Sequence, residues 1–203
     1  MIRKLLFIFT LITLFFSNCI MAQVPKNAED ISPLLIGERL PEANLLDVEG
    51  EDVFLQDILK EKPTILVFYR GGWCPYCNNQ LSSLAELEKE ILELGFQIVA
   101  ISPDHYESLK PTVDKGELDY NIYSDSGAKL IQDIGIGFKT PEKAKGYIFK
   151  KTNKNATDVL PVPTVFILDT KGKILFEYIN PDYSTRLSSE LLLASLKALE
   201  GEL

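Results

Sequence analysis

Residues 64–81 read TILVFYRGGWCPYCNNQL, and this stretch decides the fold. It begins with TILVFY, an apolar run of strand length, which is typical of a parallel strand buried on both faces. A Cys-x-x-Cys pair follows that run directly. Apolar residues then recur every three or four positions from Leu81 to Leu94, and Gly95 is a natural stop. The spacing therefore predicts a strand, a turn and a helix from about Cys74 to Leu94.

Similar patterns predict the elements around this unit. Residues 43–55 predict two short strands around a Glu-Gly turn, and TVFILDT and KILFEYI predict an antiparallel pair. Residues 105–115 predict a weak helix interrupted by Pro111, and we interpret residues 136–160 as irregular. The other predicted elements are strands at 64–69, 96–102 and 121–125 and helices at 127–135 and 187–203.

This order of elements predicts an α/β fold in which a central mixed sheet carries helices on both faces. The chain has 203 residues, of which 46% are hydrophobic and 25% charged, so one domain can bury a packed core. Its formal charge is −8 and it lacks a Lys/Arg stripe, so we expect no nucleic-acid partner. The lysine-rich stretch 138–154 is interpreted as a solvated loop, with a partner surface as the alternative.

The first residues resemble a secretory signal peptide. Arg3 and Lys4 precede an apolar run over residues 5–16, which is too short to span a bilayer because spanning takes roughly 20 residues. We predict that residues 1–22 are a signal peptide, cleaved after Ala22. Lipid attachment at Cys19 and an uncleaved anchor remain alternatives. The sequence therefore predicts an exported protein of the bacterial periplasm, with no stable membrane insertion after cleavage.

The rest of the chain is expected to form a linker over 23–34 and one domain over 35–203. Removal of the signal peptide leaves Cys74 and Cys77 as the cysteines of the mature chain. A structural disulfide between them would close a short loop and restrain the unfolded chain little. A zinc site needs about four ligands, and His105 is the only histidine. The pair is therefore interpreted as a redox pair, and we expect no metal or other cofactor.

The residues around the pair suit that chemistry. Cys74 is predicted at a helix N-terminus, where the helix dipole favours a thiolate, and Pro75 suits the first helical turn. Cys77 is one turn further on and can form a disulfide with Cys74. Arg70 adds a positive charge near Cys74. Glycines at 71 and 72 let the backbone approach a bound substrate.

Five motifs occur in an order that resembles the peroxiredoxin-like branch of the alkyl hydroperoxide reductase/thiol-specific antioxidant family, over roughly residues 35–200. They are VFYRGGWCPYCNNQLSSL, IVAISPD, SDSGAKL, LPVPTVFILDTKGKILF and NPDYSTR. The resemblance implies a thioredoxin fold and a cis-proline at Pro163. It also implies that Cys74 is the nucleophile and that Cys77 resolves the oxidised Cys74.

One position departs from the family pattern. Well-studied peroxiredoxins carry Pro-x-x-x-Thr/Ser-x-x-Cys, whose hydroxyl helps to hold the peroxide. Here Val67 replaces that proline and Gly71 replaces the hydroxyl residue, so the turn is closer to the active sites of thioredoxin and glutaredoxin. Three functions stay open: a thiol peroxidase, an exported thiol–disulfide oxidoreductase, and a non-catalytic thioredoxin-fold binding module.

In the peroxidase interpretation, the thiolate of Cys74 attacks a peroxide, and an external dithiol such as a thioredoxin-like protein reduces the resulting disulfide. Arg70 would favour the thiolate and steer the leaving oxygen. The residues expected to line the substrate pocket are Gly71, Gly72, Trp73, Pro75, Tyr76, Pro163, Tyr183 and Arg186. Several have plain alternatives: Arg70 as a solvated charge, Trp73 and Tyr76 as core cover, Tyr183 and Arg186 as helix caps. His105 is interpreted as a loop residue.

Overall fold

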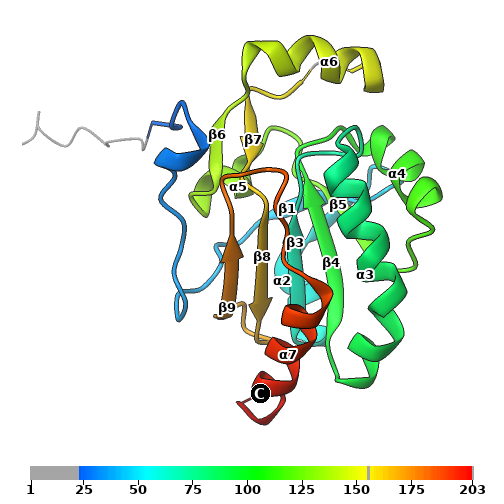
Figure 1. Cartoon of the computed structure of the whole chain (residues 1–203), viewed down its shortest axis with the longest axis vertical. Helices are drawn as coiled ribbons and strands as arrows, with labels where there is room; N and C mark the ends of the chain where they lie inside the picture. Colours follow the sequence, from blue (N-terminus) through cyan, green and yellow to red (C-terminus); the bar gives the residue numbers. More distant parts are fainter. Residues whose placement is uncertain (1–22, 155, 203) are drawn as a thin grey trace, which may run out of the picture.

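The structure, a computed structural model, describes residues 23–154 and 156–202. A seven-stranded sheet forms its centre, in the order β2-β1-β5-β4-β3-β8-β9, and β6 pairs with β7 beside it (Figure 1). The strands are β1 (Asn44–Leu46), β2 (Asp52–Phe54), β3 (Thr64–Phe68), β4 (Gln97–Ser102), β5 (Asn121–Ser124), β6 (Gly137–Lys139), β7 (Val159–Pro161), β8 (Thr164–Leu168) and β9 (Ile174–Ile179). The helices are α2 (Leu55–Glu61), α3 (Pro75–Glu93), α4 (Leu109–Gly116), α5 (Lys129–Asp133), α6 (Glu142–Thr152) and α7 (Ser189–Leu199), with short 3₁₀ turns at Ala28–Asp30, Tyr106–Ser108 and Glu200–Glu202.

The central strand β3 joins a parallel and an antiparallel half of the sheet. It pairs parallel with β4, with Phe68 opposite Ile101, and antiparallel with β8, with Phe68 opposite Thr164. Every residue of β3 is buried, because both faces of the strand are covered. The mixed sheet predicted from the sequence is therefore confirmed, and so is the antiparallel pair β8–β9. The two short strands predicted around the Glu-Gly turn are β1 and β2, which pair antiparallel.

Alternate side chains of β3 supply two cores. Ile65 and Val67 pack with apolar residues of α3, α4 and α7, whereas Leu66 and Phe68 pack with residues of α2 and α5. In Figure 1, α3 and α7 lie on the near side of the sheet and α2 lies behind it. This alternation is what the period of two along a strand requires. Helices therefore cover both faces, as predicted, and the end of β3 meets the start of α3.

Three predictions of local structure were wrong. Residues 136–160 are not irregular, because they form β6, α6 and β7. Pro111 does not interrupt its helix, because it lies in the first turn of α4, where the backbone N–H has no helical partner to lose. Residues 55–61 form the short helix α2, in a part of the chain for which no helix was predicted.

The segment expected to be a linker packs against the domain. Ser32 N–H donates to Gly135 O at 3.2 Å, and Lys139 N–H donates to Pro25 O at 2.8 Å. Val24 and Leu34 pack against the core that lies under α2 and α5. Residues 23–34 therefore pack against the domain and do not form a free linker. Their polar composition and two prolines did not reveal these contacts.

The predicted signal peptide over residues 1–22 lies outside the described residues. Within the described part of the chain, every helix is too short or too polar to cross a bilayer.

The cis-proline implied by the resemblance is also wrong. The described residues contain no cis peptide bond, so Pro163 follows Val162 through a trans bond. Val162 N–H donates to Ile136 O at 2.9 Å, and Thr164 Oγ1 donates to Val162 O at 2.9 Å. The connection between β7 and β8 makes these bonds with a trans Pro163, the form that X–Pro bonds intrinsically favour.

Candidate active site

The cysteine pair lies where β3 passes into α3. Cys74 is the N-cap residue of α3, and its carbonyl oxygen accepts hydrogen bonds from the N–H groups of Cys77 and Asn78, both at 3.1 Å. Pro75 occupies the first helical position, where its missing N–H breaks no helical bond. Cys74 therefore lies at the positive end of a long helix, which stabilises a thiolate.

The two thiols have opposite electrostatic surroundings. Both are free and buried, with exposed fractions of 1% for Cys74 and 0% for Cys77. A hydrogen bond from the Cys77 side chain lowers the pKa of Cys74 to about 6, against the opposing effect of burial. Burial raises the pKa of Cys77 well above its ordinary value, and the adjacent Cys74 raises it further. At neutral pH Cys74 is therefore the thiolate, and Cys77 keeps its proton.

Arg70 is held between two aromatic rings beside the pair. Its guanidinium carbon lies 5.0 Å from the centroid of Trp73 and 4.4 Å from that of Tyr183, which are cation–π distances. The side chain is only 8% exposed, so it is not a solvated loop charge. Its positive charge contributes to the lowered pKa of Cys74. Among the described residues Arg70 Nε has no hydrogen-bond partner, which leaves a buried donor at the site.

A turn far along the sequence reaches the same place. Arg186, between β9 and α7, directs Nη2 to the sulfur of Cys77 at 3.5 Å, and its Nη1 donates to Thr185 O at 2.9 Å. Tyr183 in the same turn meets Tyr76 edge to face, with ring centroids 5.9 Å apart. The structure therefore brings Tyr76, Tyr183 and Arg186 together over the cysteine pair.

Gly71 and Gly72 are required by close packing. Gly71 has φ +140°, a conformation that side chains rarely adopt, and a Cβ there would lie 2.5 Å from Asp104 Oδ1 and closer still to the indole of Trp73. A Cβ on Gly72 would overlap Thr112 Oγ1. The hydroxyl residue of well-studied peroxiredoxins therefore has no room at position 71.

Sequence reasoning missed Asp104. Its carboxylate accepts a hydrogen bond from Gly72 N–H at 2.8 Å and another from the Trp73 side chain, so it fixes the turn before Cys74. Burial raises the pKa of Asp104 to about 7, despite these two hydrogen bonds, and the nearby Cys74 raises it further. The signal was available: Asp104 follows β4, and the carboxyl ends of adjacent parallel strands meet at one edge of a sheet.

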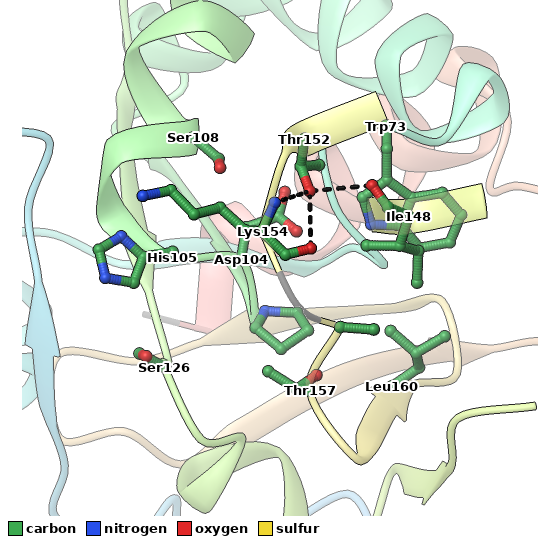
Figure 2. A pocket seen from close by; sticks show the side chains of 12 residues that line it. Trp73, Asp104, His105, Ser108, Ser126, Ile148, Thr152, Lys154, Thr157 and Leu160 are labelled. Carbon is green, nitrogen blue, oxygen red and sulfur yellow. Dashed lines mark hydrogen bonds between the residues drawn. The ribbon is translucent and has the colours of Figure 1, made fainter. Parts of the chain in front are cut away.

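Trp73 forms a wall of a cavity of about 200 Å³ under α6 (Figure 2). Trp73, Ile148 and Leu160 lie on one side of the cavity, and His105 and Ser108 lie on the other. Trp73 also packs against the small apolar cluster that β6, α6 and β7 contribute. The described residues hold no group of three His, Cys, Asp or Glu side chains that could bind a metal ion.

Pro163 and His105 occupy the connections before β8 and after β4. Pro163 is buried at the start of β8, and its carbonyl oxygen accepts a hydrogen bond from Asn180 N–H at 3.2 Å. That bond ties the β7–β8 connection to the segment that leads to Arg186. His105 is exposed in the turn after β4, where it caps the short 3₁₀ turn, as expected of a loop residue.

Comparison with known proteins agrees with this geometry. The model of the AhpC/TSA family matches residues 36–176. The thiol-disulfide oxidoreductase ResA of Bacillus anthracis is 27% identical over 163 residues, which cover 80% of each chain. A putative peroxiredoxin of Mycobacterium tuberculosis is 25% identical over 166 residues, which cover 81% of this chain and 97% of that protein.

Solved structures of low identity share the fold. The peroxidoxin BcpB from Mycobacterium tuberculosis superposes with a TM-score of 0.63 at 22% identity, covering 81% of this chain and 97% of that chain. Reduced Prx3 of Vibrio vulnificus, solved in complex with hydrogen peroxide, gives a TM-score of 0.68 at 18% identity. The match covers 80% of this chain and 99% of that chain. At this identity the two structures establish the thioredoxin-like fold.

Proposed function

The chain belongs to the AhpC/TSA family and is a thiol-based oxidoreductase, and on this premise we propose that it is a peroxidase that reduces hydrogen peroxide or organic hydroperoxides. Because the chain is an oxidoreductase, the third possible function, a non-catalytic binding module, is set aside. The observation that carries the proposal is the pairing of a Cys74 thiolate with a protonated Cys77 in one helical turn, between two arginines.

The first step is attack of the Cys74 thiolate on one peroxide oxygen. The O–O bond breaks and Cys74 becomes a sulfenic acid. The other oxygen leaves as hydroxide from hydrogen peroxide, or as alkoxide from an organic hydroperoxide, and takes a proton from solvent to form water or an alcohol. Cys77 then attacks the sulfenic sulfur. The sulfenic oxygen leaves with the Cys77 proton as a second water, and a Cys74–Cys77 disulfide remains. An external dithiol restores both thiols by exchange and becomes a disulfide itself.

Arginine replaces the missing hydroxyl in this proposal. Within the described residues, the Nε atoms of Arg70 and Arg186 are buried and have no hydrogen-bond partner. Buried donors without partners are costly, and a peroxide oxygen beside Cys74 would satisfy them. Their positive charge also stabilises the negative charge that develops on the leaving oxygen.

We place the cycle in the periplasm, on the basis of the predicted signal peptide.

The test is turnover of hydrogen peroxide with dithiothreitol as the reductant. We expect the wild-type chain to consume peroxide and the Cys74→Ser variant to lose this activity. In a separate reaction without dithiothreitol, which would itself reduce a sulfenic acid, peroxide should leave the Cys77→Ser variant with a sulfenic acid that dimedone traps at Cys74. Undiminished turnover by Cys74→Ser, or a sulfenic acid trapped at Cys77 in the wild type, would refute the assignment of the nucleophile.

A second candidate is a thiol–disulfide oxidoreductase that acts on protein disulfides. It is favoured by the similarity to ResA and by Gly71, which leaves a Trp-Cys-x-x-Cys turn without a peroxide-binding hydroxyl. Reduction of insulin disulfides, measured against peroxide turnover under the same conditions, separates the two. The second candidate would be favoured if the chain reduced insulin disulfides but reacted with peroxide no faster than free cysteine does.

A further inference from the structure

The exposed aromatic side chains of the described chain gather at its cysteine end. Large aromatic side chains are exposed at four positions, Tyr76, Tyr147, Phe149 and Tyr183, with exposed fractions between 43% and 51%. Tyr76 and Tyr183 lie over the pair, and Tyr147 on α6 meets Trp73 edge to face with centroids 6.1 Å apart. Aromatic residues are enriched in protein interfaces, so this end has the composition of a contact surface.

The helix α6 makes this end basic. It carries four lysines and one glutamate in a chain whose formal charge is −8. Lys145 is paired with Glu142 and Asp158. Lys143, Lys150 and Lys151 are exposed, and none of them forms an ion pair within the described part of the chain. The lysine-rich stretch is therefore an ordered helix, not the solvated loop expected from the sequence, and it presents three free positive charges.

A groove connects this helix to the cysteine turn. It has a volume of about 380 Å³ and is formed by the start of α3, by α4 and by α6, which Figure 1 shows projecting beyond β6 and β7. Trp73 and Pro75, which flank Cys74, line one end. Tyr147 and Lys151 line its α6 side, with the Lys151 ammonium 5.7 Å from the Tyr147 ring. The lining also holds Asp104, Lys115 and the paired Glu107 and Lys154, whereas Lys143 and Lys150 lie outside it on the same helix as Lys151. We call this cavity and the free lysines of α6 the α6 groove.

We propose that the α6 groove docks an acidic segment of the dithiol protein that reduces the Cys74–Cys77 disulfide. The inference rests on the proposed catalytic cycle, which needs such a reductant whether the oxidant is a peroxide or a protein disulfide. The rest of this acidic chain repels an acidic partner. Charges more than about 10 Å apart are screened at moderate salt, so the local lysines of α6 decide where that partner docks.

Two synthetic dithiol peptides test the charge of the partner. Both contain a Cys-Gly-Pro-Cys core, flanked by glutamates in one peptide and by lysines in the other. The full chain is oxidised to the Cys74–Cys77 disulfide with diamide, and its reduction is followed by Trp73 fluorescence. We expect the acidic peptide to react about tenfold faster or more at low salt, with the advantage lost at high salt.

Matched variants locate the effect. Replacing Lys143, Lys150 and Lys151 by glutamine should abolish the preference for the acidic peptide. Replacing Lys62, Lys171 and Lys173 by glutamine changes the net charge equally at the opposite end of the sheet and should leave the preference unchanged.

The outcomes separate this inference from the proposed function. Equal rates with the two peptides, or an equal effect of the two triple variants, would overturn the docking proposal alone. In another outcome, the chain sediments with anionic phosphatidylglycerol vesicles while the two peptides react at equal rates. That result would assign the lysines to a lipid surface and would also overturn the docking proposal. Failure of hydrogen peroxide to form the disulfide that diamide forms would count against the peroxidase and leave the docking test valid.

Discussion

Asp104 accepts a hydrogen bond from Gly72 N–H at 2.8 Å, and this bond ties the end of β4 to the turn that carries Cys74. Asn78 Nδ2, in the first turn of α3, donates to Gly72 O at 2.9 Å. Both polar groups of the Gly72 backbone are thus used to hold the turn against its neighbours. The position of Cys74 is therefore fixed by residues from two separate strand–helix units.

The carboxyl of Asp104 should make folding stability depend on pH. Its pKa of about 7 is above the value of about 4 in an unfolded chain, so the folded state binds more protons between these values. The contribution of Asp104 to the free energy of unfolding is therefore complete below about pH 4 and is lost as the pH rises through about 7. Relative to Asp104→Asn, the wild type should lose about 2 kcal/mol of unfolding free energy between about pH 5 and pH 7.

Urea unfolding of the two proteins at the two pH values measures this difference. The comparison with Asp104→Asn cancels the titration of groups that both proteins share and that do not interact with Asp104. A difference that does not change with pH would show that Asp104 is ionised in the folded state throughout the range.

Loss of the Arg186 charge should raise the pKa of Cys74. The Arg186 charge is among those that lower this pKa, and its guanidinium reaches the sulfur of Cys77 at 3.5 Å. The Arg186→Gln variant should therefore show a higher pKa by ultraviolet thiolate absorbance and a slower reaction with peroxide at neutral pH. Arg39→Gln is the control, because Arg39 contacts Lys171 O at the opposite end of the sheet. Equal pKa values in both variants would exclude an electrostatic role for Arg186.

Restoring the family hydroxyl at position 71 should damage the enzyme. In Gly71→Ser the new Cβ meets Trp73 and Asp104, and the backbone is strained at φ +140°. Overpacking and strain together predict a loss of about 2–4 kcal/mol and slower peroxide turnover. Gly95→Ser is the matched control, since Gly95 has φ +86° but open space around it, so its loss should be near 1 kcal/mol. A Gly71→Ser variant that is as stable as Gly95→Ser and faster with peroxide would contradict the packing at this turn.

The sequence revealed the parts of the fold that have strong local patterns. The strand 64–68 and the helix that follows Cys74 were predictable because an apolar run and a periodic stripe mark them. The helix α6 was not, because Ile148 is its only buried residue and four of its other ten residues are lysines. Its position depends on contacts with Trp73 and with β6 and β7. A pattern of apolar residues within the helix cannot reveal such contacts.

The candidate site was predictable only in part for a related reason. The helix N-terminus and the Cys-x-x-Cys spacing indicated Cys74 and Cys77 directly. The position of Asp104 after β4 placed it at the carboxyl edge of the sheet, but it did not reveal the hydrogen-bond partner. That partner is the backbone N–H of Gly72, 32 residues earlier, and a backbone donor leaves no mark in a sequence. The role of Gly71 became clear only when its surroundings were seen to leave no room for a side chain.

The central claim is that Cys74 is a thiolate tuned to attack peroxide, and Trp73, the only tryptophan, reports on it directly. Stopped-flow fluorescence of the reduced chain mixed with hydrogen peroxide, measured from about pH 5 to pH 8, tests the claim. We expect a signal that is linear in peroxide, far faster than free cysteine, absent in Cys74→Ser, and half-maximal near the Cys74 pKa of about 6. A rate no greater than that of free cysteine with the same thiolate fraction would contradict it and leave the disulfide oxidoreductase as the function of this cysteine pair.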